Sequence, residues 1–286
     1  MTRQPQPSEI AWTLWAGTIG LDSPITSRVE AATAAGYQRI SLSPPDVARA
    51  ESAGIRAGEL GRMIRDAGLG IVLDPVMNWY QGVPTGASSF AAFSMDDALR
   101  MCEALGAEAM SAMANVGPGG DTPATEFAEA YGRLCDRASD LGVRVQLEFI
   151  PMTAVPDLAA AWRIVKSADR DNGGLLFDTW HFFRGTPDFR LLGRIPGERV
   201  FAVQLSDAPA DVHGTLLQDT RRRSVPGDGS FDLPRVVAVL HRIGALREVG
   251  PEVIHPALEA MPAVAAARLA GDRSRALISR TLAGTR

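Results

Sequence analysis

The chain has 286 residues, 46% of them hydrophobic and 22% charged, and its 29 basic and 33 acidic residues give a formal net charge of −4. This composition predicts a globular protein with a full-sized core, and the weak acidity argues against nucleic acid as a partner, since its binders carry a basic face. No apolar run approaches the roughly 20 residues of a membrane span, and residues 1–10 lack a signal-peptide core. Cys102 and Cys135 fall in predicted helices, where no disulfide framework is expected. We therefore expect a cytoplasmic protein with no membrane partner.

Short apolar runs alternate with amphipathic stretches from one end of the chain to the other. The apolar runs predict buried strands at residues 10–15, 37–43, 70–76, 107–116, 143–151, 173–181, 199–209 and 251–256. The amphipathic stretches predict helices at 25–36, 54–68, 94–106, 122–142, 157–168, 231–244 and 261–282. About eight β/α units predict an α/β fold, a single (β/α)8 TIM barrel that forms one domain over residues 1–286. A doubly wound open sheet is the alternative, but the turn after the first strand lacks the G-x-G-x-x-G pattern.

Polar residues that can bind a metal lie near the ends of the last four predicted strands. They are Glu148, Asp178, Gln204 and Glu252. We expect them to converge, because the chemistry of a TIM barrel lies at the carboxyl ends of its strands. Buried carboxylates repel one another, and burying each unpaired charge costs several kcal/mol, so a divalent cation is expected among them. Gln204 raises a related question, because an amide inside a buried strand needs hydrogen-bond partners.

The segments around these residues resemble the xylose isomerase-like TIM barrels, the sugar phosphate isomerase/epimerase group with inosose isomerases and dehydratases, ketose 3-epimerases and 3-dehydroshikimate dehydratases. The segments are LEFIP (147–151), FDTWH (177–181), VQLSDAP (203–209), RRRSVPGDGSFDL (221–233) and PEVIHP (251–256). The resemblance implies one divalent ion held by Glu148, Asp178, Gln204 and Glu252. It also implies a substrate contact from His181, in a D-x-x-H step, and it matches the R-x-x-P-G-x-G step that begins at Arg223. A substrate contact is expected of Arg223 because a guanidinium pairs with an acidic or oxyanionic group.

The resemblance further implies proton abstraction next to a carbonyl, through an enediolate that the metal stabilises. Glu148 and Glu252 would be the catalytic acid and base of an isomerase or epimerase acting on a small hydroxy-ketone or sugar-like substrate. A metal-dependent dehydratase of the 3-dehydroshikimate or inosose type is the alternative, and a non-catalytic binding role is a lesser one. Ala154 and Ala210 stand where ketose 3-epimerases carry Glu and Arg, which disfavours a free ketohexose. Ile150 stands where other dehydratases place a candidate histidine base.

Further candidates lie near the expected mouth of the barrel. Substrate contacts are also predicted for Trp15, Trp79, Tyr80 and His255. Trp79 and Tyr80 belong to a loop, residues 77–90, that would form a lid or an apolar wall over a small-molecule substrate.

Ligation by oxygen alone favours Mn²⁺ or Mg²⁺, with Co²⁺ and Zn²⁺ as alternatives. Glu248 replaces Glu252 as the last ligand if the final strand is shifted. A homodimer and a homotetramer both stay open.

Overall fold

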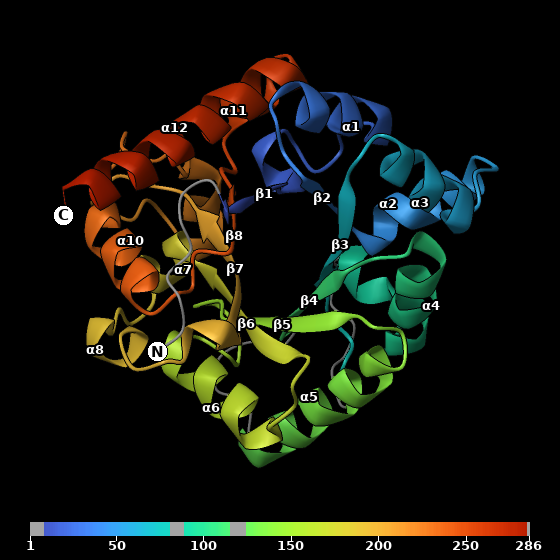
Figure 1. Cartoon of the computed structure of the whole chain (residues 1–286), viewed down its shortest axis with the longest axis horizontal. Helices are drawn as coiled ribbons and strands as arrows, with labels where there is room; N and C mark the ends of the chain where they lie inside the picture. The colour runs from blue at the N-terminus through green and yellow to red at the C-terminus, as the bar shows by residue number, and fades with distance from the viewer. Residues whose placement is uncertain (1–8, 81–88, 115–123, 285–286) are drawn as a thin grey trace. The chain divides into compact units, whose positions relative to one another are not determined.

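The strands of the barrel follow one another around it in sequence order. The computed structural model describes residues 9–80, 89–114 and 124–284. Its parallel strands close in the order β1 to β8 (Figure 1). Their bounds are β1 Ala11–Leu14, β2 Arg39–Leu42, β3 Gly70–Val76, β4 Ala109–Met113, β5 Arg144–Glu148, β6 Gly173–Asp178, β7 Val200–Leu205 and β8 Glu248–Pro251. This closed eight-stranded barrel confirms the predicted (β/α)8 fold.

Helices occupy the connections between the strands. The α-helices are α1 Ile25–Ala34, α2 Pro44–Ser52, α3 Ala57–Asp66, α4 Met95–Leu105, α5 Ala124–Ser139, α6 Leu158–Ala168, α7 Thr179–Arg184, α8 Phe189–Leu192, α9 Leu216–Asp219, α10 Leu233–Arg242, α11 Pro256–Glu259 and α12 Ala263–Ala283. The short 3-10 helices are η2 Ala16–Thr18, η3 Ser89–Ala92, η4 Gly197–Arg199 and η5 Thr220–Arg222. No helix in the described parts of the chain is both long enough and apolar enough to cross a membrane.

The eighth strand lies earlier than predicted, at 248–251 instead of 251–256. It pairs with β7 through Gln204↔Gly250 and Leu205↔Pro251, and with the start of β1 at its other end. Gly250 fits there because it has no side chain: a Cβ would lie 1.8 Å from the carbonyl oxygen of Thr13. Pro251 then ends the strand, since it has no N–H to donate to a ladder. The apolar residues that follow therefore lie beyond the strand.

Capping residues set helix starts where the sequence suggests them. The Ser94 hydroxyl accepts from the backbone N–H of Asp97 and donates to its carboxylate, so α4 begins in a capping box. The helix ends at Gly106, whose φ of +66° is the left-handed conformation that glycine adopts most easily. Thr122, the predicted start of the helix that corresponds to α5, lies outside the described residues.

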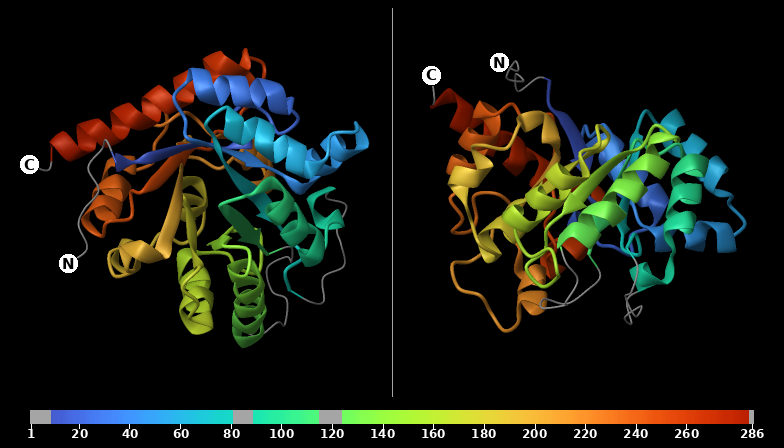
Figure 2. Two further views of the ribbon diagram at one scale, coloured as in Figure 1. Left: turned by 45° about the vertical axis from the view of Figure 1, so that its right-hand side comes forward. Right: turned by 90° about the horizontal axis from the view of Figure 1, so that it is seen from below.

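The chain divides into two compact units, residues 1–40 with 177–286 and residues 41–176. In the first unit, α12 lies alongside α1 and α10, as the left view of Figure 2 shows. In the second unit, α5 packs against α6 and α3 against α4. The single domain over 1–286 stays a prediction.

Candidate metal centre

Asp178 joins the end of β6 to the start of α7. Its carboxylate Oδ1 accepts from the backbone N–H of His181 at 3.0 Å and so caps α7. This cap ends the predicted strand at Asp178 and turns the rest of the apolar run into a helix. The D-x-x-H spacing therefore has a structural meaning, because it places the His181 ring one helical turn from the carboxylate. Its Nε2 lies 4.0 Å from Asp178 Oδ2.

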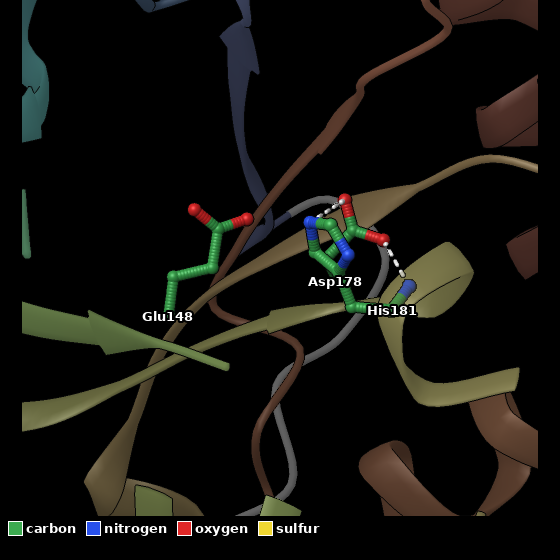
Figure 3. Close-up of side chains that lie close together, drawn as sticks. All are labelled: Glu148, Asp178 and His181. Carbon is green, nitrogen blue, oxygen red and sulfur yellow. Dashed lines mark hydrogen bonds and ion pairs between the residues drawn. The ribbon is translucent and has the colours of Figure 1, made fainter. Parts of the chain in front are cut away.

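Glu148, the last residue of β5, completes a buried group with these two residues (Figure 3). One ligand atom from each of Glu148, Asp178 and His181 can be chosen so that all lie within 4.8 Å of one another. Two carboxylates and an imidazole at this spacing are a donor set that divalent metals accept. The sequence assigned His181 to the substrate, whereas the structure places it among the possible metal ligands.

Gln204 is a predicted metal ligand on β7, the strand after β6 in the barrel order, and the residue is 1% exposed. Among the residues that the structure describes, neither its amide oxygen Oε1 nor its nitrogen Nε2 has a hydrogen-bond partner. Native proteins rarely leave such a group unmet, and an exception calls for a bound ligand or another functional reason. A cation bound by Oε1 would satisfy the oxygen, so the residue fits the proposed metal.

Arg223 bridges two of the predicted ligands. Its Nη1 donates to Asp178 Oδ2 at 2.7 Å, to Glu252 Oε2 at 2.9 Å and to the Glu252 carbonyl oxygen at 3.1 Å. The guanidinium is buried, with its Cζ 5.2 Å from the centre of the Trp180 ring. Arg223 was predicted to contact substrate, and in the structure it first of all neutralises the ligand carboxylates. A bound cation would share Asp178 and Glu252 with it or displace it.

The choice between Glu252 and Glu248 follows from their positions on β8. Glu248 begins the strand, where its Oε1 accepts from Thr13 Oγ1 at 3.0 Å and its Oε2 lies 3.7 Å from Arg39 Nε. Glu252 directly follows the strand and shares Arg223 with Asp178. The carboxyl end of the strand, where barrel chemistry is found, therefore carries Glu252.

The protonation states of the site suit metal binding. Burial, opposed by the charge of Asp178 and assisted by that of Arg223, lowers the pKa of His181 to about 4. Burial by itself would raise the pKa of Asp178, but the charge of Arg223, the His181 side chain and the hydrogen bonds from its neighbours hold it below its ordinary value. At neutral pH the site thus offers a carboxylate and a neutral imidazole, the forms that bind metals.

The other predicted substrate residues have structural contacts. Trp79 Nε1 donates to the Met113 carbonyl at 2.9 Å, and Tyr80 packs on Phe127 with 4.5 Å between ring centres. Of the loop 77–90 that they begin, residues 81–88 lie outside the described ranges. Substrate roles for Trp79 and Tyr80 stay predictions.

Trp15 and His255 are placed differently. Trp15 is fully buried after β1, and no described residue forms a hydrogen bond with its Nε1. His255 caps α11, because its Nδ1 accepts from the backbone N–H of Ala257 at 3.0 Å. Both substrate roles stay predictions.

Comparisons with known proteins agree with the fold. The chain belongs to the xylose isomerase-like TIM barrel family, whose model matches residues 29–272. A 3-dehydroshikimate dehydratase of Pseudomonas aeruginosa is 26% identical over 246 residues, which cover 86% of this chain and 38% of that protein. An inosose isomerase of Bacillus velezensis is 30% identical over 155 residues, 54% of this chain and 55% of that protein. The chain thus spans about half the length, or less, of these relatives.

Solved structures show the same fold. The crystal structure of the IOLI protein with a bound zinc atom superimposes with a TM-score of 0.84 at 21% identity and covers 95% of this chain and 99% of that one. The structure of L-ribulose 3-epimerase gives a TM-score of 0.69 at 18% identity and covers 96% of this chain and 97% of that one. At these identities the likeness shows the barrel architecture.

Proposed function

We propose that the chain is a divalent-metal-dependent isomerase or epimerase that acts on a small hydroxy-ketone or sugar-like substrate. The observation that carries the proposal is Gln204, a buried amide for which the described part of the chain offers no partner to either polar atom. It lies on the strand that follows the buried group of Glu148, Asp178 and His181 in the barrel order. The activities in the names of the relatives support the same class of chemistry.

The ion would be held by Glu148, Asp178, Gln204 and Glu252, with His181 as a further donor. Bound there, it supplies a positive charge that stabilises the negative charge developing on a substrate oxygen when a neighbouring C–H loses its proton. Oxygen ligands alone favour Mn²⁺ or Mg²⁺, whereas a contribution from the His181 nitrogen favours Mn²⁺, Co²⁺ or Zn²⁺ over Mg²⁺. A neutral His181, which its lowered pKa ensures at neutral pH, can give that nitrogen.

The protein side chains would move the proton. Glu148 and Glu252 are the glutamates at the carboxyl ends of β5 and β8, and each can accept a proton at a carboxylate oxygen and return it. If one glutamate removes the proton and the other returns it to the opposite face, the product is an epimer. If one glutamate does both steps on adjacent carbons, the product is an aldose–ketose isomer. Arg223 holds Glu252 through Oε2 and so fixes its orientation.

A dehydratase is the second candidate, because a relative that matches 86% of the chain carries that activity in its name. The same carbanion loses water if the carbon next to it bears a hydroxyl group. The two candidates differ in their products and not in the first proton transfer.

Proton NMR in D₂O separates the candidates. Cyclic keto-polyols and cyclic keto-acids are incubated with the protein and Mn²⁺, and then treated with EDTA to remove the paramagnetic ion before spectra are recorded. For the first function we expect an epimer or isomer with deuterium at the carbon to which the proton is returned. For the second we expect an alkene formed by loss of that proton and of the neighbouring hydroxyl group as water. Glu148→Gln and Glu252→Gln should each slow the exchange by at least 100-fold, the scale of a general base. Glu248→Gln is the matched control on the other end of β8 and should keep the rate. Equal exchange after EDTA treatment of the enzyme itself would contradict the proposal.

A further inference from the structure

Asp207 organises the loop that follows Arg223, although no role in the site was predicted for it from the sequence. It lies just beyond the end of β7 and is buried. Its carboxylate accepts three backbone N–H groups: Oδ1 accepts from Ala208 and from Phe231, each at 2.9 Å, and Oδ2 accepts from Gly227 at 3.0 Å. Hydrogen bonds to a carboxylate are among the stronger ones in proteins. The Asp207 side chain therefore holds the backbone of Gly227 and Phe231 against the end of β7.

The backbone of this loop, residues 224–231, is tied to the same place. Asp207 and Ser224 exchange two backbone hydrogen bonds of 2.9 and 2.8 Å. The N–H of Ser230 donates to the Ala208 carbonyl at 2.8 Å. Gly229 lies so close that a Cβ would be 2.3 Å from Asp207 Oδ1 and 2.5 Å from the Ala208 oxygen. The loop is thus wrapped tightly around the Asp207 carboxylate.

Arg223 is the residue immediately before this loop. Its backbone position is set by the bridge between Ser224 and Asp207, and its buried guanidinium reaches Asp178 and Glu252. A long side chain keeps one such geometry only if its backbone start is fixed. We propose that Asp207 is a positioning residue: through residues 224–231 it holds the Arg223 guanidinium between the Asp178 and Glu252 carboxylates. Asp207 contacts neither carboxylate and acts through Arg223.

The first test reads out Arg223 in the metal-free protein, so it does not depend on the proposed function. Buried arginines in stable ion pairs give separate guanidinium ¹⁵N–¹H signals, and Arg223→Lys identifies those of Arg223 by their loss. We expect them in the wild type and expect Asp207→Ala to remove them by faster exchange. Asp207→Asn should keep part of them, because its Oδ1 can still accept from Ala208 and Phe231 while its NH₂ faces the N–H of Gly227.

The control is Asp232→Ala. Asp232 also accepts a backbone N–H, from Arg235 at 3.2 Å, but it caps α10 and does not hold the loop. This variant loses a capping bond and should keep the Arg223 signals. If Asp207→Ala does not fold, Gly229→Ala tests the same loop with the Asp207 carboxylate intact and should also remove them. A folded Asp207→Ala or Gly229→Ala protein with unchanged Arg223 signals would overturn the proposal.

The second test, Mn²⁺ titration by calorimetry, rests on the proposed function. A cation competes with the Arg223 guanidinium for Asp178 and Glu252, so Arg223→Met should bind Mn²⁺ about tenfold more tightly, as removal of a nearby like charge predicts. Asp207→Ala should shift the affinity in the same direction, and the double variant should equal Arg223→Met. A further shift in the double variant would mean that Asp207 acts independently of Arg223, against the proposal. Failure of the wild type to bind any divalent ion would contradict the proposed function. The Arg223 NMR signals would still test the role of Asp207.

Discussion

Replacement of Gln204 by leucine should change stability in opposite directions with and without a metal ion. Both polar atoms of the Gln204 amide are buried and have no hydrogen-bond partner within residues 9–80, 89–114 and 124–284. A buried polar group left unmet costs about 1–3 kcal/mol. Leucine has a similar volume and no polar atom, so Gln204→Leu should raise the free energy of unfolding of the metal-free protein by about 1–3 kcal/mol.

The expected change in melting temperature follows from the size of the chain. Unfolding entropy is about 2.1 cal/mol/K per residue near 60 °C, so the 286 residues give roughly 0.6 kcal/mol/K. Gln204→Leu should therefore raise Tm by about 2–5 °C in EDTA. A metal ion at 100 times its Kd stabilises the wild type by about 2.7 kcal/mol, or roughly 4–5 °C. A tenfold loss of affinity in the variant would reduce this gain to about 1.4 kcal/mol, or roughly 2 °C.

Thermal melts followed by circular dichroism, in EDTA and then in Mn²⁺, measure both effects. Gln146 provides the matched control, since it is equally buried but its Nε2 donates to Ser111 Oγ at 3.0 Å. Gln146→Leu should lower Tm in EDTA, because it leaves Ser111 without that bond, and it should keep the metal-induced gain. If Gln204→Leu lowers Tm in EDTA as Gln146→Leu does, or if its metal-induced gain equals that of the wild type, the reasoning about Gln204 is wrong.

Three further outcomes are expected. Gln204→His should shift metal preference toward Zn²⁺ or Co²⁺, because an imidazole nitrogen replaces an amide oxygen; an unchanged ratio of Mn²⁺ and Zn²⁺ affinities argues against direct ligation. Asp219→Ala should lower the free energy of unfolding by about 3–5 kcal/mol in urea titrations, since it leaves the buried Arg184 without its 2.7 Å partner; a loss below about 1 kcal/mol would contradict this. The free energy of unfolding of the metal-free protein should increase as the pH rises from about 4 to 6.5. In this range the lowered pKa of His181 leaves the folded state with fewer bound protons than the unfolded state. His181→Gln should flatten this slope, and an equally steep slope in that variant would refute the assignment.

The sequence predicted the barrel and the polar residues near the ends of its strands because both depend on local patterns. Buried parallel strands give continuous apolar runs, and a carboxylate or amide at the end of such a run stands out. Asp178 and Gln204 were found in this way. The last strand was misplaced because its short pairing segment, which includes Gly250, is less apolar than the residues after Pro251.

Long-range contacts could not be predicted in the same way. Arg223 lies in an unremarkable basic run, and its ion pairs with Asp178 and Glu252 form only after the chain has folded. The partners of Asp207 are backbone N–H groups as many as 24 residues away, which no side-chain pattern reveals. The D-x-x-H spacing did contain a usable signal, since a capping residue at the start of a helix places the residue three positions later beside it.

The helix cap at Asp178 also limits how this carboxylate can serve an ion. Oδ1 already accepts the N–H of His181, and the other oxygen, Oδ2, is directed toward Arg223. If Oδ1 keeps the His181 N–H and an ion is held through Oδ2 alone, Asp178 would be a monodentate ligand. A monodentate carboxylate occupies one coordination position instead of two, which leaves a larger share of the coordination sphere to the oxygens of a substrate.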